Sequence, residues 1–321
     1  MTSPLLNLPG AVAAEGRDEG VAAHYGELYG EQRALADGRG FVDLSHRGVI
    51  TVTGPERLSW LHLLLTQHLT ELPPGQATEA LILSANGHIE HALYLVDDGE
   101  TVWAHVEPGT QEALLAYLES MKFFYRVETA DRTGEFAVVY LPAGSTAEVP
   151  KEYAVRETPY GRDVFVPRDA LEAFAAAHGP AAGLDAYEAL RVEAHRPRLG
   201  AETDHRTIPH ELGWIGTAVH LQKGCYRGQE TVARVHNLGK PPRRLVFLHL
   251  DGSDVLLPPH GTPVRLAADG AEGRQLGFVT TAVRHHELGP IALALVKRNV
   301  PVDAELLAGT IAAAQEVVVA P

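Results

Sequence analysis

The sequence predicts an α+β protein that carries a separate all-β module at its C-terminus. Up to Lys240, stretches with helical spacing of apolar residues alternate with short strand-like runs. After Lys240-Pro241-Pro242 the pattern becomes strand, turn, strand, without a long helix. Turn signals there lie at Asp251-Gly252, Asp269-Gly270 and Leu288-Gly289-Pro290. Regularly spaced short strands are typical of a small barrel or sandwich, so we expect a boundary near residue 240.

The N-terminal part is expected to open with a poorly ordered lead-in, residues 1–22, which is rich in Gly, Ala and acidic residues. Residues 41–44 and 49–52 predict two strands, and Thr53-Gly54-Pro55 opens a helix whose leucines keep helical spacing up to Leu69. Further strands are expected at 79–83, 92–96, 101–106, 136–141 and 163–166, and helices at 110–120, 168–178 and 183–193. Asn86-Gly87 predicts a hairpin turn between the first two of these strands. The C-terminal strands are expected at 245–250, 262–266, 277–283, 291–296 and 317–319.

The composition is that of an ordinary globular protein with an acidic surface. The chain has 321 residues, 45% of them hydrophobic, and a formal net charge of −14, which argues against binding to nucleic acid. The apolar runs are too short to span a bilayer, which takes ~20 residues, and no secretory leader is recognisable. We therefore expect no membrane association. The one cysteine, Cys225, excludes an intrachain disulfide and fits a reducing cytoplasm.

The charge distribution and the motifs of the sequence favour only a few kinds of binding or catalytic site. Between Arg191 and Arg244, ten Lys and Arg stand against five Asp and Glu, so the local charge is +5. Such a cluster indicates a small anionic ligand, with a salt-bridged surface as the alternative. The sequence has no Walker A motif, dinucleotide fingerprint, Gly-x-Ser-x-Gly or His-Glu-x-x-His. We expect no metal site among the 17 histidines, whereas a Cys–His nucleophile pair stays open.

One octapeptide is unusual in its own right. It consists of Lys223, Gly224, Cys225, Tyr226, Arg227, Gly228, Gln229 and Glu230. Its glycines permit positive φ or a close backbone approach to a ligand, and its cations favour the thiolate form of the only cysteine. The octapeptide predicts either a functional turn built around Cys225 or a tight turn with a buried structural cysteine.

The octapeptide, followed by Val232-Ala233-Arg234, resembles the signature of the YgfZ family. These proteins are folate-binding relatives of the glycine cleavage T-protein, an aminomethyltransferase. Further likeness lies in residues 41–48, in Trp60-Leu61 with Thr66-Gln67, in residues 190–193 and in residues 289–294. The resemblance covers roughly residues 24–321. It implies a three-domain cloverleaf around a central funnel, with two α+β subdomains, one of them ferredoxin-like, in residues 23–240 and a β-barrel in residues 241–321.

The resemblance also implies a site for tetrahydrofolate or a one-carbon derivative. Glu193 matches the carboxylate that anchors the pterin, whose edge offers adjacent N–H donors. Arg191 and Trp103 match further positions near the folate. His91 falls where the transferases have a catalytic aspartate, which departs from the family pattern. A histidine can act as a base near neutral pH but lacks the fixed negative charge.

Three functions compete on these observations. The first is a cytoplasmic folate-binding accessory protein for iron–sulfur cluster assembly or repair, with Cys225 as its functional thiol and with client or assembly proteins as partners. Since clusters need about four ligands, one cysteine would have to share a cluster with a partner. The second is a folate-dependent aminomethyltransferase or another one-carbon transferase. The third is an interaction scaffold whose octapeptide only stabilises the fold. The oligomeric state is not predicted.

Overall fold

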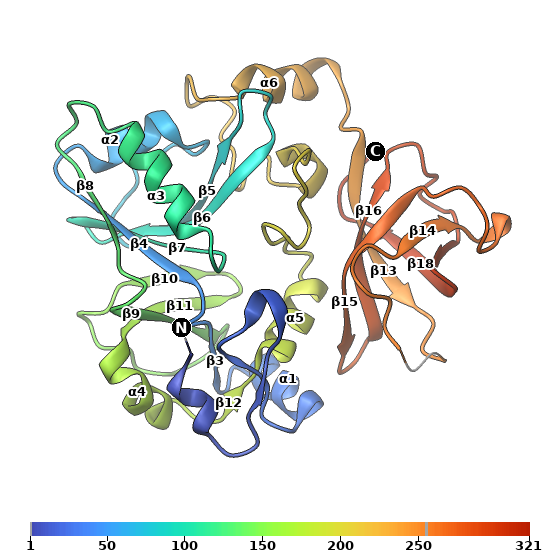
Figure 1. The fold of residues 1–321 in the computed structure, drawn as a ribbon, viewed down its shortest axis with the longest axis horizontal. Coiled ribbons are helices and arrows are strands. Elements are labelled where there is room, and N and C mark those ends of the chain that lie inside the picture. Colours follow the sequence, from blue (N-terminus) through green and yellow to red (C-terminus); the bar gives the residue numbers. More distant parts are fainter. Residues whose placement is uncertain (1, 254–255) are drawn as a thin grey trace. The chain divides into compact units, whose positions relative to one another are not determined.

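The computed structural model describes residues 2–253 and 256–321. The chain forms two compact units (Figure 1). Unit 1 comprises Met1–Ile82, His91–Tyr187 and Gln222–Tyr226, and unit 2 comprises Leu83–Glu90, Glu188–Leu221 and Arg227–Pro321. Each unit has a hydrophobic core of its own. The prediction of an α+β protein with a C-terminal barrel is confirmed.

The first sheet of unit 1 has the strand order β5-β6-β7-β4-β8. Its strands are β4 (Gly48–Thr53), β5 (Ala77–Leu83), β6 (Ile89–Asp97), β7 (Thr101–Val106) and β8 (Glu128–Asp131). Alternate residues such as Val52, Leu95 and Ala104 point to one apolar face. Helices α2 (Arg57–Leu64) and α3 (Gln111–Ser120) bury Trp60 and Leu114 in the same core.

Two local predictions can be compared directly with this sheet. The Asn86-Gly87 turn is confirmed, because Gly87 has φ +78 and the Ser84 N–H donates to the His88 carbonyl at 2.8 Å. Helix α2, in contrast, ends at Leu64 and does not reach Leu69. After it, the Thr66 N–H donates to the Leu81 carbonyl at 3.0 Å, which draws the chain onto β5. Leu69 is buried all the same, outside the helix.

The second sheet of unit 1 has the order β10-β11-β9-β3-β12. Its strands are β3 (Phe41–Asp43), β9 (Phe136–Pro142), β10 (Val155–Thr158), β11 (Gly161–Pro167) and β12 (Ala181–Ala182). Only the β12–β3 pair is parallel. Helix α4 (Leu171–Ala177), which follows η3 (Arg168–Ala170), packs Phe174 into the core of this sheet. Helix α1 (Leu28–Ala36) was not predicted.

The prediction of a poorly ordered lead-in over residues 1–22 is wrong for the described residues 2–22. They form η1 (Pro4–Asn7), β1 (Val12–Ala13), η2 (Gly16–Asp18) and, with residues up to 24, β2 (Ala22–His24). Leu5 joins the core of the second sheet and Val21 is fully buried. The Ser3 hydroxyl donates to the Asp43 carboxylate at 2.5 Å. Two apolar anchors and a buried hydrogen bond therefore order this segment, although its sequence shows no sustained apolar period.

The C-terminal part of unit 2 is a closed barrel with the strand order β13-β16-β15-β14-β17-β18. The strands are β13 (Arg243–Leu250), β14 (Pro263–Leu266), β15 (Gly277–His285), β16 (Gly289–Lys297), β17 (Leu306–Ala308) and β18 (Ile311–Val317); η5 (Ala267–Asp269) follows β14. Val246 pairs with Ala294 and Leu248 with Ala292, and all four side chains belong to the barrel core. A bulge interrupts β15 between Val279 and Thr281.

Long irregular segments lead from α5 (Leu184–Glu193) to the barrel. They contain η4 (Pro209–Leu212) and α6 (Gln229–Leu238). Helix α6 was missed, because the glycines of the octapeptide favoured a turn there. No helix within residues 2–253 and 256–321 has the length and apolar character needed to cross a membrane.

Candidate functional site

Glu193 occupies the last turn of α5, and the way this helix ends is unusual. His195 has φ +55, and the Arg196 N–H donates to the Arg191 carbonyl at 3.0 Å. The His195 N–H donates to the Val192 carbonyl, also at 3.0 Å. This is a Schellman cap with histidine where glycine is usual, which costs about 1 kcal/mol or more. Backbone strain of this kind gathers at functional sites.

The Glu193 carboxylate is exposed and is not explained by helix stability. Its side chain is 45% accessible, and an acidic group at a helix C-terminus has the wrong sign for the macrodipole. Its Oε2 lies 3.3 Å from Nε2 of His285, the last residue of β15. The remaining carboxylate surface is accessible to a ligand.

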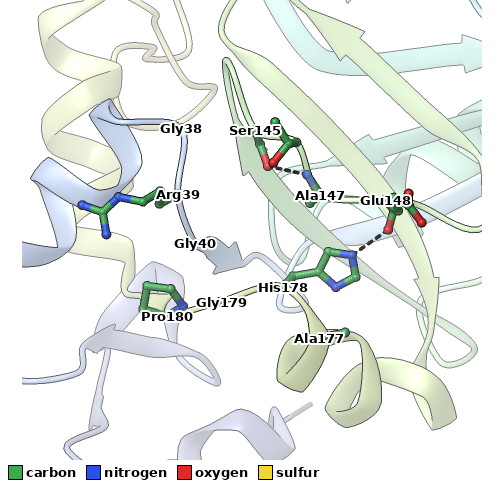
Figure 2. A pocket seen from close by; sticks show the side chains of 11 residues that line it. Gly38, Arg39, Gly40, Ser145, Ala147, Glu148, Ala177, His178, Gly179 and Pro180 are labelled. Atoms are coloured by element: carbon green, nitrogen blue, oxygen red, sulfur yellow. Dashed lines mark hydrogen bonds between the residues drawn. The ribbon is translucent and has the colours of Figure 1, made fainter.

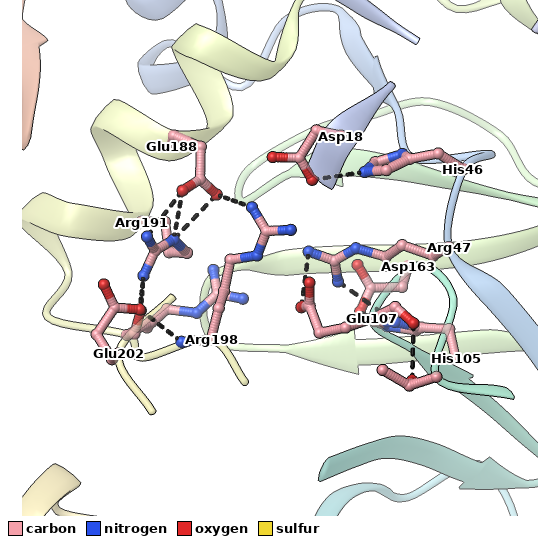
Figure 3. Close-up of polar contacts among 12 residues, drawn as sticks. Asp18, His46, Arg47, His105, Glu107, Asp163, Glu188, Arg191, Arg198 and Glu202 are labelled. Atoms are coloured by element: carbon pink, nitrogen blue, oxygen red, sulfur yellow. Dashed lines mark hydrogen bonds and ion pairs between the residues drawn. The ribbon is translucent and has the colours of Figure 1, made fainter. Parts of the chain in front are cut away.

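Arg191, two positions earlier on α5, points away from Glu193, because residues i and i+2 do not share a helix face. Figure 3 shows its guanidinium between two carboxylates. Arg191 donates to Glu188 at 2.7 Å and to Glu202 at 3.0 Å, and it is buried. Burial alone would lower the pKa of Arg191, but the two carboxylates raise it above the ordinary value. Contacts within the protein therefore account for the burial and charge of Arg191. A contact between Arg191 and folate stays a prediction.

Glu202, at the centre of this network, is fully buried and heavily hydrogen-bonded. Its Oε2 accepts the Arg191 guanidinium and the backbone N–H of Arg198, at 3.0 and 2.8 Å. Its Oε1 accepts the hydroxyls of Thr280 and Thr281, at 3.1 and 2.5 Å. Consecutive strand residues normally face opposite ways, and the bulge in β15 allows both to reach one oxygen.

The basic cluster of residues 191–244 is neutralised in part by protein carboxylates. Arg198 pairs with Glu188 at 3.0 Å. Arg243 pairs with Asp204 at 2.6 Å and with Glu211 at 2.8 Å. With Arg191 and Arg227, at least four of its ten cations are in ion pairs. The salt-bridged alternative therefore accounts for part of this cluster, and two of the partner carboxylates, Glu188 and Glu90, lie outside residues 191–244.

The first half of the octapeptide belongs to unit 1, where His62 holds it. The His62 ring donates from Nε2 to the Lys223 carbonyl at 3.0 Å. The Lys223 ammonium donates in return to the His62 carbonyl and lies 5.1 Å above the Tyr226 ring. The His62 Nδ1 accepts the Leu69 N–H at 3.2 Å, which fixes the tautomer as Nε2–H. Lys223 and Tyr226 are buried.

Cys225 is exposed beside this clamp, so the alternative of a buried structural cysteine does not apply. Burial lowers the pKa of the Lys223 ammonium to about 8, and the neighbouring Cys225 opposes this shift. Gly224, between them, has φ +99, a conformation that a side chain would strain. The buried ammonium of Lys223 and the accessible thiol of Cys225 are thus separated in sequence by one glycine, Gly224.

The second half of the octapeptide belongs to unit 2 and forms the start of α6. Gly228 is the N-cap with φ +83, and a Cβ there would lie 2.6 Å from the Ser84 carbonyl oxygen. A Cβ on Gly87 would meet the Thr231 side chain at 2.9 Å. The two glycines therefore let the hairpin tip lie directly against α6. Arg227 pairs with Glu90 of that tip at 2.9 Å.

The remaining signature residues lie on α6 itself. Gln229 is its first residue, Glu230 lies in the first turn, where an acidic group suits the helix dipole, and Arg234 follows one turn later. Glu230 and Arg234 are exposed. These three residues therefore present polar groups on a surface helix, and their functional role stays a prediction.

Trp103 and His91 lie in the first sheet of unit 1 but are not brought together. Trp103 on β7 pairs with Val96, five residues along β6 from His91, so the two lie about 16 Å apart at 3.3 Å per residue. The odd number of steps also places them on opposite faces. The indole of Trp103 donates to Asp98 at 2.8 Å and packs edge-on against Phe136.

Sequence reasoning missed a buried ionic network in unit 1, also drawn in Figure 3. His105 contacts Asp163 at 3.0 Å through Nε2 and Arg47 at 3.3 Å through Nδ1. Arg156 donates to Asp163 at 2.9 Å. Burial lowers the pKa of His105 to about 4, assisted by the two arginines. Burial would raise the pKa of Asp163, but His105 and Arg156 hold it below its usual range. These residues are scattered in sequence, so no spacing pattern reveals them.

A cavity of about 710 Å³ in unit 1 contains none of the predicted site residues. Figure 2 shows its lining, which includes Arg39, Glu148 and His178. Both ring nitrogens of His178 face carbonyl oxygens, those of Phe174 at 2.5 Å and Glu148 at 2.7 Å. Among the residues that the structure describes, no three His, Cys, Asp or Glu side chains are placed to hold a metal ion.

Comparison with known proteins relates this architecture to one family. The model of the GCVT N-terminal domain matches residues 21–150. An aminomethyltransferase of Streptomyces avermitilis is 30% identical over 315 residues, 85% of this chain and 82% of that protein. Those of Rubrobacter xylanophilus and Herpetosiphon aurantiacus are 29% and 28% identical, over 86% of this chain and 81% and 84% of theirs. Glycine cleavage system aminomethyltransferase T from Bartonella henselae shares the fold with a TM-score of 0.80 at 20% identity, over 98% of this chain and 94% of that one. The chain therefore belongs to the aminomethyltransferase family.

Proposed function

We propose that the protein binds tetrahydrofolate, or a one-carbon derivative of it, with Glu193 as the anchor of the pterin. The observation that carries this proposal is the exposed Glu193 carboxylate at the end of α5, behind a strained helix cap. Neither the helix dipole nor burial explains a carboxylate there. A carboxylate can accept both N–H groups of a pterin edge in charge-assisted hydrogen bonds. The names of the relatives, aminomethyltransferases, agree with a folate ligand.

We further place the chain in the YgfZ subfamily, as an accessory factor for iron–sulfur cluster assembly or repair in the cytoplasm. Support comes from the complete octapeptide and from Cys225, which is exposed next to the clamped Lys223. The Cys225 thiol would take part in thiol exchange with a client or assembly protein. Alternatively, it would supply one ligand of an iron–sulfur cluster whose other ligands come from that protein. In this account, residues 23–240 bind the folate and residues 241–321 form the barrel domain.

A folate-dependent aminomethyltransferase is the alternative, which the names of the relatives favour. Such a reaction needs a base or a fixed charge beside the folate nitrogen. His91 stands at the position that matches the catalytic aspartate, and a neutral imidazole does not provide that charge. We therefore prefer the accessory role.

Two assays on the purified protein separate these functions. Calorimetric titration with tetrahydrofolate tests the shared ligand, and a turnover assay with tetrahydrofolate and aminomethyl-lipoyl carrier protein tests the transferase. We expect binding without turnover. Turnover at a rate typical of transferases would establish the alternative, and no binding at millimolar ligand would refute both folate functions.

A further inference from the structure

His285 is held so that one particular ring nitrogen faces Glu193. It is the last residue of β15 and is 2% accessible. Its Nδ1 accepts two backbone N–H groups, those of Glu287 at 3.2 Å and Leu288 at 3.1 Å. A neutral imidazole that accepts at Nδ1 carries its proton on Nε2. The turn after β15 therefore fixes the tautomer, and the Nε2–H group points to the Glu193 side of the ring.

The contact between His285 and Glu193 is polar and loosely aligned. Nε2 lies 3.3 Å from Oε2, but the geometry does not meet that of a regular hydrogen bond. Contacts of functional groups are commonly long before a ligand binds and shorten in the complex. The loose contact leaves the carboxylate oxygens with lone pairs for a second partner.

The same geometry keeps His285 neutral. A proton on Nδ1 would displace both backbone N–H groups, so charging the ring costs two hydrogen bonds. Burial lowers the pKa of His285 as well, and the His286 ring, 4.5 Å away, acts in the same direction. Glu193 and Glu287 act in the opposite direction, but the pKa stays below its ordinary value. A neutral donor orients the carboxylate and leaves its negative charge in place. A lysine or arginine at this position would neutralise that charge.

We propose that His285 is the positioning residue of the pterin anchor: its Nε2–H group orients the Glu193 carboxylate toward the N–H edge of the pterin. This inference rests on the proposed folate function and deepens it. It assigns to the barrel strand β15 a role in ligand recognition that acts through Glu193. Folate affinity then depends on an amide or imidazole donor at this position and not on its charge.

Two substitutions separate the two contacts of the ring. In His285→Asn, the side-chain oxygen replaces Nδ1 as acceptor for the turn, but no donor reaches Glu193. In His285→Gln, the amide group reaches as far as Nε2. His286→Asn is the matched control, because it alters the neighbouring ring and leaves the Nε2–H group in place. Tetrahydrofolate affinity by calorimetry, melting temperature and ¹⁵N NMR of the labelled histidines are measured for each variant.

We expect His285→Asn to weaken tetrahydrofolate binding about tenfold, the loss of one hydrogen bond to a charged group. The melting temperature stays unchanged, and His285→Gln and His286→Asn bind within threefold of the unmodified chain. The NMR spectrum of the unmodified chain shows His285 protonated only at Nε2 from pH 7 to 8. Unchanged affinity of His285→Asn, equal losses in Asn and Gln, or protonation of Nδ1 in this range would overturn the role of His285 alone. An unmodified chain that does not bind tetrahydrofolate would overturn the proposed function, and this inference with it.

Discussion

The thiol segment of unit 1 and the carboxylate at the end of α5 in unit 2 are built alike but held differently. Each presents one exposed group, Cys225 or Glu193, near a buried or half-buried histidine. In both histidines, His62 and His285, Nδ1 accepts a backbone N–H, so the proton lies on Nε2. The His62 ring donates to the Lys223 carbonyl, and the His62 carbonyl accepts the Lys223 ammonium. His62 therefore positions the Cys225 thiol only indirectly, through Lys223. His285 faces the Glu193 carboxylate itself. We therefore expect His62 to matter for local stability and His285 for ligand affinity.

Removal of the thiol should have the largest effect on function and the smallest on the fold. We expect Cys225→Ala to abolish support of iron–sulfur enzymes in cells, because no other thiol exists in the chain. The side chain is exposed, so the melting temperature should be unchanged. Measurement of an iron–sulfur enzyme's activity in cells that carry only the variant, beside a melting curve, checks both. Full activity would favour the scaffold function, and a large fall in melting temperature would make Cys225 a packing residue.

A third histidine, His105, differs from both because a buried ionic network surrounds it and it reaches no exposed group. Its pKa is lowered to about 4 in the folded chain, against about 6.5 when unfolded. The unfolded chain therefore binds more protons between these values, and stability falls as the pH drops from 6.5 to 4. The loss amounts to at most about 3 kcal/mol for this group.

Urea unfolding of the unmodified chain and of His105→Gln, at several pH values between 4.5 and 7, measures this contribution. The variant should show a shallower pH dependence, and His205→Gln, which alters an exposed histidine, should show the original one. Identical pH slopes in all three proteins would rule out a buried neutral His105.

Substitution of His62 tests the indirect half of the comparison. His62→Ala removes the ring contacts to the Lys223 carbonyl and the Leu69 N–H, two neutral hydrogen bonds with a combined contribution of about 2 kcal/mol. Loss of the contact to the Lys223 carbonyl also loosens the backbone next to Cys225, so the rate at which iodoacetamide alkylates this exposed thiol should change. The exposed His205→Ala is the control. An unaltered alkylation rate together with unaltered stability would show that His62 does not hold this segment.

Local patterns predicted much of the fold, and tertiary contacts decided the remainder. Helix α3, the Asn86-Gly87 hairpin and most barrel strands follow from periodicity and turn residues. Strand β17 has three residues and gives no pattern of its own. Helix α6 was missed because Gly228 acts as its N-cap with positive φ, a conformation that also marks turns.

For the candidate site, sequence reasoning selected the exposed groups and missed their supports. Cys225 and Glu193 were named from the octapeptide and the family resemblance. His62 and His285 act on residues 161 and 92 positions away (223 − 62 and 285 − 193), a separation that no local spacing encodes. Arg191 was grouped with Glu193 by the family resemblance, whereas helix geometry turns it to Glu188 and Glu202.

Titration of the unmodified chain and of Glu193→Gln with tetrahydrofolate tests whether Glu193 anchors the pterin. If the carboxylate accepts two charge-assisted hydrogen bonds from the pterin, the amide should bind about a hundredfold more weakly. Glu287→Gln, which changes another exposed carboxylate, should bind like the unmodified chain. Equal affinities of the unmodified chain and Glu193→Gln would contradict the assignment of Glu193 as the pterin anchor.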